Sequence, residues 1–268
     1  MKHRRFAPVL AAVALFALSS CSMQSMVYPG SRMQLPDAAC GYPTYTLELP
    51  TEDGTSTLHG WFFNRGANTP LVVMFGGNAQ NVGTLANIAA ADPSRSYLLM
   101  NYRGYGDSTG EPSQKTIVAD ARYSIRYARA AMGNPAAQLY LAGFSLGSAV
   151  ATHVAISEQP AGIVLICPFD NARTVACNVV PLIPRILPLD PWDSVRVAPQ
   201  ITCPVTIMQA NYDKSIPEIS TQKLIQAFRT PPIVHKFDAD HNNIFTATGF
   251  RQLLLQAMPV TEHSKFDF

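Results

Sequence analysis

Short apolar runs alternate with longer stretches of helical periodicity along most of the chain. Runs of five or six residues predict strands at 44–49, 58–63, 71–75, 97–101, 139–143, 163–167, 204–209 and 233–237. Apolar residues three or four positions apart predict helices at 82–91, 113–132 (capped by Ser113), 146–157, 217–228 and 243–257. Alternating strands and helices form a parallel sheet covered on both faces. The pattern predicts an α/β fold whose first two strands form an antiparallel edge hairpin.

The segment 169–200 interrupts this alternation. It carries prolines at positions 181, 184, 188, 191 and 199 among apolar residues, so it cannot form one continuous helix. Two interpretations remain open: a small cap whose apolar residues line a pocket, or an irregular connection packed on the sheet.

The first twenty residues have the three parts of a secretory signal peptide: a basic start at 1–5, an apolar run at 6–18 and small residues before Cys21. An apolar run of this length is short for a membrane-spanning helix. The sequence LSSC at 18–21 resembles the lipobox of bacterial lipoproteins, which implies a lipid on Cys21, and Ser22 favours an outer-membrane protein facing the periplasm. An ordinary signal peptide cut nearby and an uncleaved anchor are the alternatives.

These features divide the chain into a signal peptide at 1–20, a tether at 21–43 that would attach the protein to the membrane through the lipid, and one domain at 44–268. The formal charge is +2, with 20 basic and 18 acidic residues. Three of the basic residues lie in the signal peptide, and no basic cluster occurs elsewhere. The composition therefore argues against a nucleic-acid partner, and nothing in it reveals an oligomeric state.

Four cysteines remain after Cys21, at positions 40, 167, 177 and 203. Export permits disulfides, and four cysteines allow three connectivities. Cys40 and Cys177 lie in irregular segments and are the favoured pair, whereas Cys167 and Cys203 lie at the ends of apolar runs and read as buried small residues. The spacing lacks the CxxC pairs of zinc sites, so we expect no metal.

The clearest chemical motif is G-x-S-x-G at 143–147, directly after a predicted strand and before a helix of small residues. In this context the glycines permit a tight turn that exposes the hydroxyl of Ser145 at the carboxyl end of the sheet. A serine hydroxyl needs a base to become a nucleophile, and this arrangement places an acid and then a histidine later in the chain.

Two residues fit that order. Asp213 follows the strand at 204–209 and can orient a histidine, with Asp170 as the alternative acid. His241 follows the last predicted strand, where loops converge on the nucleophile, and is the predicted base. His235 would project from a strand and His263 lies in a polar tail, so neither is favoured.

Residues 57–257 resemble α/β-hydrolase domain proteins of the branch that includes monoacylglycerol-lipase-like enzymes, protein depalmitoylases and serine aminopeptidase-like hydrolases. The resemblance rests on FGGNA at 75–79, NYRGYGDSTG at 101–110, the Ser145 turn and the Asp213 and His241 loops. It implies the α/β-hydrolase fold, an oxyanion hole formed by the N–H groups of Asn78 and Leu146, and a scaffold role for Arg103 and Asp107. The family usually has His-Gly at 76–77, whereas this chain has Gly76 and Gly77.

We therefore expect a serine hydrolase that cleaves a small-molecule ester or thioester through an acyl-enzyme intermediate, without a cofactor. The apolar residues of 179–189 favour an acyl substrate over a peptide. The alternatives are a peptidase of the same fold and an envelope lipoprotein that binds lipid or a partner without catalysis.

Overall fold

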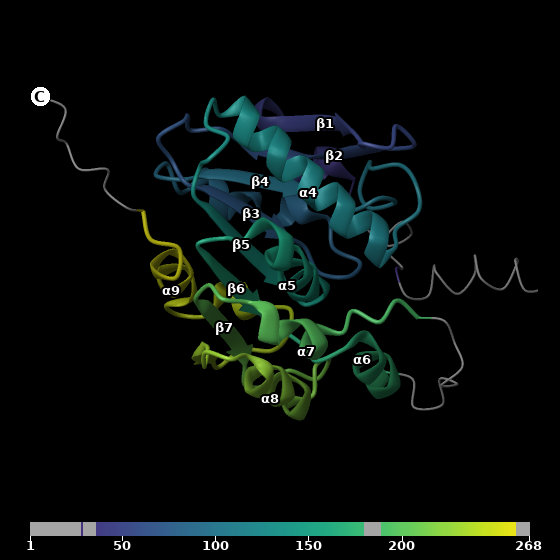
Figure 1. Cartoon of the computed structure of the whole chain (residues 1–268), viewed down its shortest axis with the longest axis vertical. Helices are drawn as coiled ribbons and strands as arrows, with labels where there is room; N and C mark the ends of the chain where they lie inside the picture. Colours follow the sequence, from purple (N-terminus) through teal and green to yellow (C-terminus); the bar gives the residue numbers. More distant parts are fainter. Residues whose placement is uncertain (1–27, 29–35, 180–188, 261–268) are drawn as a thin grey trace, which may run out of the picture.

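Eight strands form one sheet in the order β1-β2-β4-β3-β5-β6-β7-β8 (Figure 1). The computed structural model describes residue 28 and residues 36–179 and 189–260. The strands are β1 (Thr46–Pro50), β2 (Thr57–Phe63), β3 (Leu71–Phe75), β4 (Ser96–Met100), β5 (Leu139–Phe144), β6 (Gly162–Ile166), β7 (Val205–Ala210) and β8 (Ile233–Phe237). β1 and β2 pair antiparallel, β2 joins β4 antiparallel, and all other pairs are parallel. The predicted α/β fold and edge hairpin are confirmed.

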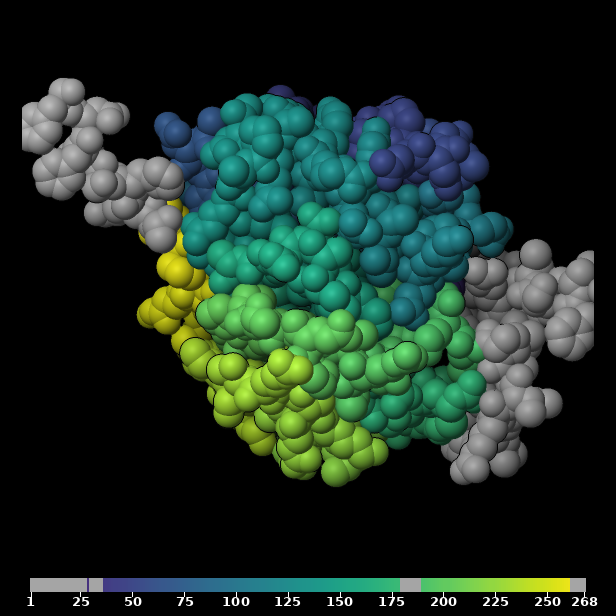
Figure 2. All heavy atoms as spheres, in the orientation of Figure 1, coloured from purple at the N-terminus to yellow at the C-terminus, as the bar shows by residue number. Residues whose placement is uncertain are grey.

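Helices cover both faces of this sheet. They are η1 (Asp37–Cys40), η2 (Pro43–Tyr45), η3 (Val82–Leu85), α3 (Ala86–Ala90), α4 (Gln114–Ala131), α5 (Leu146–Glu158), α6 (Ala172–Val179), α7 (Ser194–Val197), η4 (Ala198–Gln200), α8 (Glu218–Ala227), η5 (Ile244–Thr246) and α9 (Phe250–Gln256). Apolar residues of α4, α5 and α8 pack on one face, the face toward the viewer in Figures 1 and 2, while those of α3 and α9 form a second cluster on the other. Because β3 to β8 run parallel, their carboxyl ends share one edge of the sheet.

Two helix predictions needed correction. The predicted helix at 243–257 is interrupted: Gly249 has φ of 79°, a left-handed conformation that an α-helix cannot contain, and α9 begins only at Phe250. The helix predicted at 82–91 starts as the 3-10 turn η3, because Asn81 caps Gly83 N–H and imposes a tight first turn. The predicted cap of α4 is present, since Ser113 accepts from the Thr116 N–H and Thr116 accepts from the Ser113 N–H.

The segment expected to act as a tether is partly packed on the domain. Tyr28 is only 3% exposed, and η1 lies against the turn at η3, with the Asp37 carboxylate accepting from the amides of Asn81 and Asn101. Residues 1–20 and Cys21 lie outside the described residues.

In the candidate cap segment, α6 precedes positions 180–188, which also lie outside the described residues, and the chain then returns to the fold. Trp192 is fully buried, with its ring edge-on to His153 of α5. Residues 189–200 are thus a connection packed on the helical layer, while a cap function at 180–188 stays a prediction.

The favoured disulfide is not formed. All four described cysteines are free thiols. Cys40 packs beside Gly83 at η3, which follows β3. Cys177 lies on α6, which follows β6, and β5 separates β6 from β3 in the sheet. Irregular local structure was therefore a poor guide to pairing, because pairing requires the two segments to meet.

Arg103 anchors the loop after β4 through a buried ion pair with Asp120 and a half-exposed one with Asp53. Its Nε lies 2.7 Å from Asp120 Oδ2 and its Nη2 lies 2.8 Å from Asp120 Oδ1, a bidentate pair to α4. Nη2 also reaches Asp53 Oδ2 at 3.0 Å. The side chains of Arg103 and Asp120 are 7% and 8% exposed. These contacts are structural and are consistent with the expected scaffold role.

We expect Arg103→Ala to lower the free energy of unfolding by about 3–5 kcal/mol, because it leaves the Asp120 carboxylate buried without its cation. Arg126→Ala is the matched control: its pair with Glu52 is exposed on both sides, and its loss should cost less than about 1 kcal/mol. Urea unfolding of both variants measures the difference. Equal losses would contradict the anchoring role of Arg103.

Candidate active site

Ser145 occupies a strained turn between β5 and α5. Its φ of 52° and ψ of −114° lie in a region that residues other than glycine rarely adopt. The Ser145 N–H donates to the carbonyl of Ile166 on β6 at 2.9 Å, which fixes the turn to the neighbouring strand. The turn places Ser145 at the carboxyl edge of the sheet, at the amino end of α5.

The two glycines of the motif are required by close backbone contacts. A Cβ at Gly143 would lie 2.0 Å from the carbonyl oxygen of Gly147, and one at Gly147 would lie 2.2 Å from the carbonyl oxygen of Phe75. No side chain fits at either position without moving backbone. The G-x-S-x-G spacing is therefore what allows the helix to start directly against β3.

Asp213 lies in the loop after β7, and its carboxylate is held on both oxygens. Oδ1 accepts from the backbone N–H groups of Ser215 and Ile216, each at 2.8 Å. Burial alone would raise the pKa of Asp213, but the hydrogen bond and charge of His241 together with these two N–H groups outweigh it and lower the pKa. The carboxylate therefore stays ionised and oriented.

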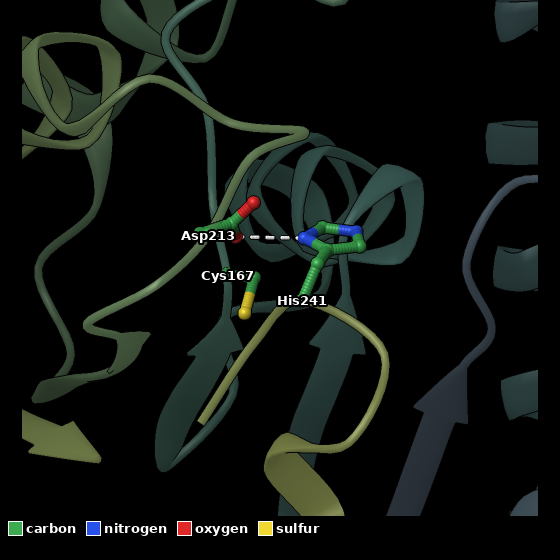
Figure 3. A group of neighbouring side chains, drawn as sticks. All are labelled: Cys167, Asp213 and His241. Carbon is green, nitrogen blue, oxygen red and sulfur yellow. Dashed lines mark hydrogen bonds and ion pairs between the residues drawn. The ribbon is translucent and has the colours of Figure 1, made fainter. Parts of the chain in front are cut away.

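His241 follows β8 and faces Asp213, as Figure 3 shows. Its Nδ1 lies 2.7 Å from Asp213 Oδ2, and the residue is 9% exposed. Its ring lies 4.9 Å from that of Phe144, the residue before Ser145. With Nδ1–H donating to the carboxylate, Nε2 is left as the basic nitrogen. The structure thus brings together the predicted acid and base beside the predicted nucleophile turn.

The other sequence candidates lie elsewhere. The Asp170 carboxylate is tied to the hydroxyls of Ser220 at 2.6 Å and Thr174 at 3.1 Å. His235 lies on the edge strand β8, half-buried. His263 is outside the described residues.

The loop after β3 carries the predicted oxyanion donor Asn78. The Asn78 side-chain oxygen accepts from the hydroxyl of Tyr105 at 2.5 Å and from the Ala79 N–H at 3.1 Å. Leu146 is the first residue of α5, where N–H groups have no partner within the helix. Asn78 and Leu146 thus follow two adjacent strands, β3 and β5, at the edge that carries Ser145.

Comparison with known proteins decides the family. A sequence model of the alpha/beta hydrolase fold matches residues 70–185. An uncharacterized protein of Mycobacterium tuberculosis is 31% identical over 242 residues, which cover 86% of each chain. The chain belongs to the alpha/beta hydrolase family. Its fold also resembles an esterase of Pyrococcus furiosus, with a TM-score of 0.65 and 15% identity over 84% of this chain and 94% of that one.

A further relative of this alpha/beta hydrolase has a named activity. The lysophosphatidylserine lipase of Danio rerio is 26% identical over 187 residues, which cover 63% of this chain and 48% of the relative. Membership of the alpha/beta hydrolase family supports a hydrolase activity. No described helix of the chain is long and apolar enough to cross a bilayer.

Gln80 supports the loop after β3 through hydrogen bonds of its side chain. Where the family has His, this hydrolase has Gly76, whose carbonyl accepts from the buried Tyr102 hydroxyl at 2.8 Å. The Gln80 side-chain oxygen accepts from the Gly77 N–H at 2.8 Å, and its amide donates to the Thr84 hydroxyl at 2.9 Å. Sequence analysis missed Gln80, because a glutamine three residues beyond a glycine carries no distinctive pattern.

Gln80→Ala should lower kcat/KM about tenfold, the equivalent of one lost hydrogen bond of about 1.4 kcal/mol at the oxyanion loop. The loss should fall on kcat, because the loop carries Asn78, the predicted donor to charge that develops in the transition state. Gln226→Ala on the exposed side of α8 is the control. Ester kinetics for both variants measure the effect, and an unchanged kcat for Gln80→Ala would show that the loop needs no such support.

Cys167 lies next to the pair formed by Asp213 and His241. Sequence analysis described it only as a buried small residue. It is 1% exposed and has φ of 47° at the end of β6, where its N–H donates to Met208. Its sulfur lies within 4.8 Å of a carboxylate oxygen of Asp213 and of a ring nitrogen of His241 (Figure 3). Burial and then the Asp213 charge raise the pKa of the thiol, so the thiol stays protonated.

This group and a second one, Asp37, His59 and Asp107, are the described clusters whose atoms could hold a metal. In the first, the 2.7 Å hydrogen bond already occupies His241 Nδ1 and Asp213 Oδ2, and a protonated thiol is a poor ligand. In the second, Asp37 Oδ1 already accepts from two amides. We assign no metal, and its absence stays a prediction.

Proposed function

We propose that this alpha/beta hydrolase cleaves carboxylic esters or thioesters with Ser145 as nucleophile, His241 as base and Asp213 as the acid that orients it. The observation that carries the proposal is the 2.7 Å hydrogen bond from His241 Nδ1 to Asp213 Oδ2, placed at the sheet edge that also holds the strained Ser145 turn. This arrangement is the one that activates a serine hydroxyl.

In the proposed reaction, His241 Nε2 takes the proton of the Ser145 hydroxyl as the oxygen attacks the acyl carbon. His241 then gives this proton to the leaving alkoxide or thiolate, and an acyl-Ser145 ester remains. Water attacks that ester with His241 again acting as base, which releases the acid and restores Ser145. Asp213 keeps the proton on Nδ1 and stabilises the imidazolium that forms.

The N–H groups of Asn78 and Leu146 are proposed to bind the oxyanion of each tetrahedral intermediate. Each such donor contributes roughly 2.7–4 kcal/mol to transition-state stabilisation in enzymes of this kind. The amino end of α5 favours the same negative charge. All these groups come from the chain itself, so the proposed reaction requires no cofactor.

An acyl compound is the favoured substrate class. The apolar residues of 179–189 and the lipase activity named for the Danio rerio relative support it. Assignment to the monoacylglycerol-lipase-like or depalmitoylase-like branch rests on the motifs at 75–79 and 101–110. A series of p-nitrophenyl esters of increasing acyl length, run beside aminoacyl p-nitroanilides, separates esterase from peptidase.

A fluorophosphonate probe tests the nucleophile. We expect one covalent adduct, mapped by mass spectrometry to the peptide that contains Ser145, and no adduct on heat-unfolded protein. Ser157→Ala, at the distal end of α5, should label like the wild type. An unlabelled wild type, or equal labelling of Ser145→Ala, would favour the alternative of an envelope lipoprotein that only binds lipid or a partner.

We also propose that Cys21 carries a lipid and places the hydrolase on the outer membrane, facing the periplasm. The lipobox resemblance at 18–21 and Ser22 support this. Mass analysis of the mature amino terminus tests it: an acylated Cys21 is expected, and an unmodified Cys21 or cleavage elsewhere would overturn it.

A further inference from the structure

Tyr28 is fixed inside the domain by hydrogen bonds, only seven residues after Cys21. It is 3% exposed. Its hydroxyl donates to Asp190 Oδ2 at 2.5 Å and accepts from Trp192 Nε1 at 2.8 Å. Detaching the tyrosine would leave the buried indole N–H of Trp192 without this acceptor and the Asp190 carboxylate without this donor, which is unfavourable. Tyr28 is therefore a fixed point for the chain that precedes it.

This fixed point lies at the carboxyl edge of the sheet. Asp190 Oδ2 also accepts from the Gln114 N–H at 2.7 Å, and the Gln114 side chain accepts from the Trp192 N–H at 2.9 Å. Gln114 is the first residue of α4, which begins at that edge because it follows the loop after β4. The Tyr28 anchor is thus on the edge that carries Ser145.

The anchor and the loop that carries Asn78 are connected through one apolar cluster. Tyr28 shares an apolar cluster with Tyr105, and the Tyr105 hydroxyl donates to the side chain of Asn78. One residue, Tyr105, therefore links the surroundings of the anchor to the proposed site.

The short connection limits how the domain can turn. Seven residues span at most about 25 Å when fully extended. A domain of this size has a radius of gyration of about 17 Å and a width well above about 25 Å. With the lipid of Cys21 in a bilayer, the edge that holds Tyr28 must stay close to the membrane, and the opposite edge cannot replace it.

We propose that Tyr28 holds the active-site edge toward the membrane that carries the Cys21 lipid, so that the hydrolase takes its acyl substrate from the lipid surface. This inference rests on the proposed function and on the proposed lipid anchor. The substrate class is an ester of a fatty acid with a polar headgroup, present in the bilayer itself and not dissolved in water.

The test uses full-length lipidated protein in vesicles of phosphatidylethanolamine and phosphatidylglycerol. Two substrates are compared: a lysophospholipid in the same vesicles and p-nitrophenyl butyrate in the water. One variant carries a 30-residue Gly-Ser insertion between Ser25 and Met26, which lengthens the connection and leaves the domain unchanged. A second variant, Tyr28→Phe, keeps the ring and removes the hydroxyl.

We expect the insertion to lower hydrolysis of the vesicle ester about tenfold, because effective concentration falls with roughly the 3/2 power of linker length. Hydrolysis of the butyrate should not change. Tyr28→Phe should lower the vesicle rate in the same direction, with the butyrate rate retained. Amide exchange in 101–113 should slow on vesicles for the wild type and not for the insertion variant.

Equal vesicle rates for the wild type and the insertion variant would overturn the inference while leaving the hydrolase function in place. A wild type that cleaves the butyrate but not the vesicle ester would do the same. A wild type that cleaves neither would overturn the proposed function, and an unmodified Cys21 would remove the anchor on which the orientation depends.

Discussion

Ser145→Ala is expected to lower kcat about a million-fold, the loss found when the nucleophile of a serine hydrolase is removed. The reason is that no other hydroxyl can replace it: the turn exposes this side chain alone at the amino end of α5, while the Ser148 hydroxyl donates to the Ser145 carbonyl at 2.6 Å. Substrate binding and the proposed oxyanion donors would remain, so residual activity above the uncatalysed rate is expected.

The fold should survive this change, because alanine keeps the backbone hydrogen bond to Ile166 and adds no atoms to the turn. Thermal unfolding of Ser145→Ala within a few degrees of the wild type would establish that. Ser157→Ala provides the kinetic control. A Ser145→Ala variant that kept more than about a hundredth of the wild-type kcat would exclude the proposed nucleophile, since removal of a triad member costs far more.

The sequence predicted the strands to within about two residues and missed features set by tertiary contacts. The strands β3, β5 and β6 are buried on both faces, and such strands leave unbroken apolar runs in the sequence. The interruption at Gly249 was missed, because one glycine inside an apolar period does not reveal its backbone angle.

The contact between the predicted acid and the predicted base was itself predictable for a topological reason. Residues that follow consecutive parallel strands meet at one edge, so Asp213 after β7 and His241 after β8 were bound to be close. Tyr28, Gln80 and Cys167 were not predictable in this way. Tyr28 and Cys167 lie beside residues that are distant in the sequence. Gln80 acts through its side-chain rotamer, and neither kind of contact leaves a spacing in the sequence. The preference for Cys40 with Cys177 failed for the same reason.

Asp213→Asn is expected to lower kcat about ten-thousand-fold with little loss of stability, the effect of removing the carboxylate that orients a catalytic histidine. An amide at this position can donate to His241 Nδ1, which would place the imidazole proton on Nε2 and leave no base facing Ser145. The backbone donors Ser215 and Ile216 can still reach the remaining oxygen, so the loop should hold.

Asp170→Asn is the matched comparison, because Asp170 is also a buried aspartate after a strand and also fits the order of acid before base. Its carboxylate accepts from Ser220 and Thr174, and its side chain is 3% exposed. Its replacement should cost about 1–3 kcal/mol of unfolding free energy, the penalty of disturbing buried hydrogen bonds, and should leave kcat within a few-fold.

The two asparagine variants are therefore expected to give opposite results in the same measurements. Kinetics and urea unfolding of both should show activity lost at Asp213 and stability lost at Asp170.

Acid conditions add a further distinction. Because the pKa of Asp213 is lowered in the fold, its stabilising contribution is complete above the unfolded carboxyl pKa of about 3.9 and is lost only as pH falls through the lower folded value. Loss of wild-type activity at a pH well above 3.9 must then come from protonation of a group other than Asp213. If Asp170→Asn instead abolished activity and Asp213→Asn did not, the acid would be Asp170, and the hydrogen bond between Asp213 and His241 would have only a structural role.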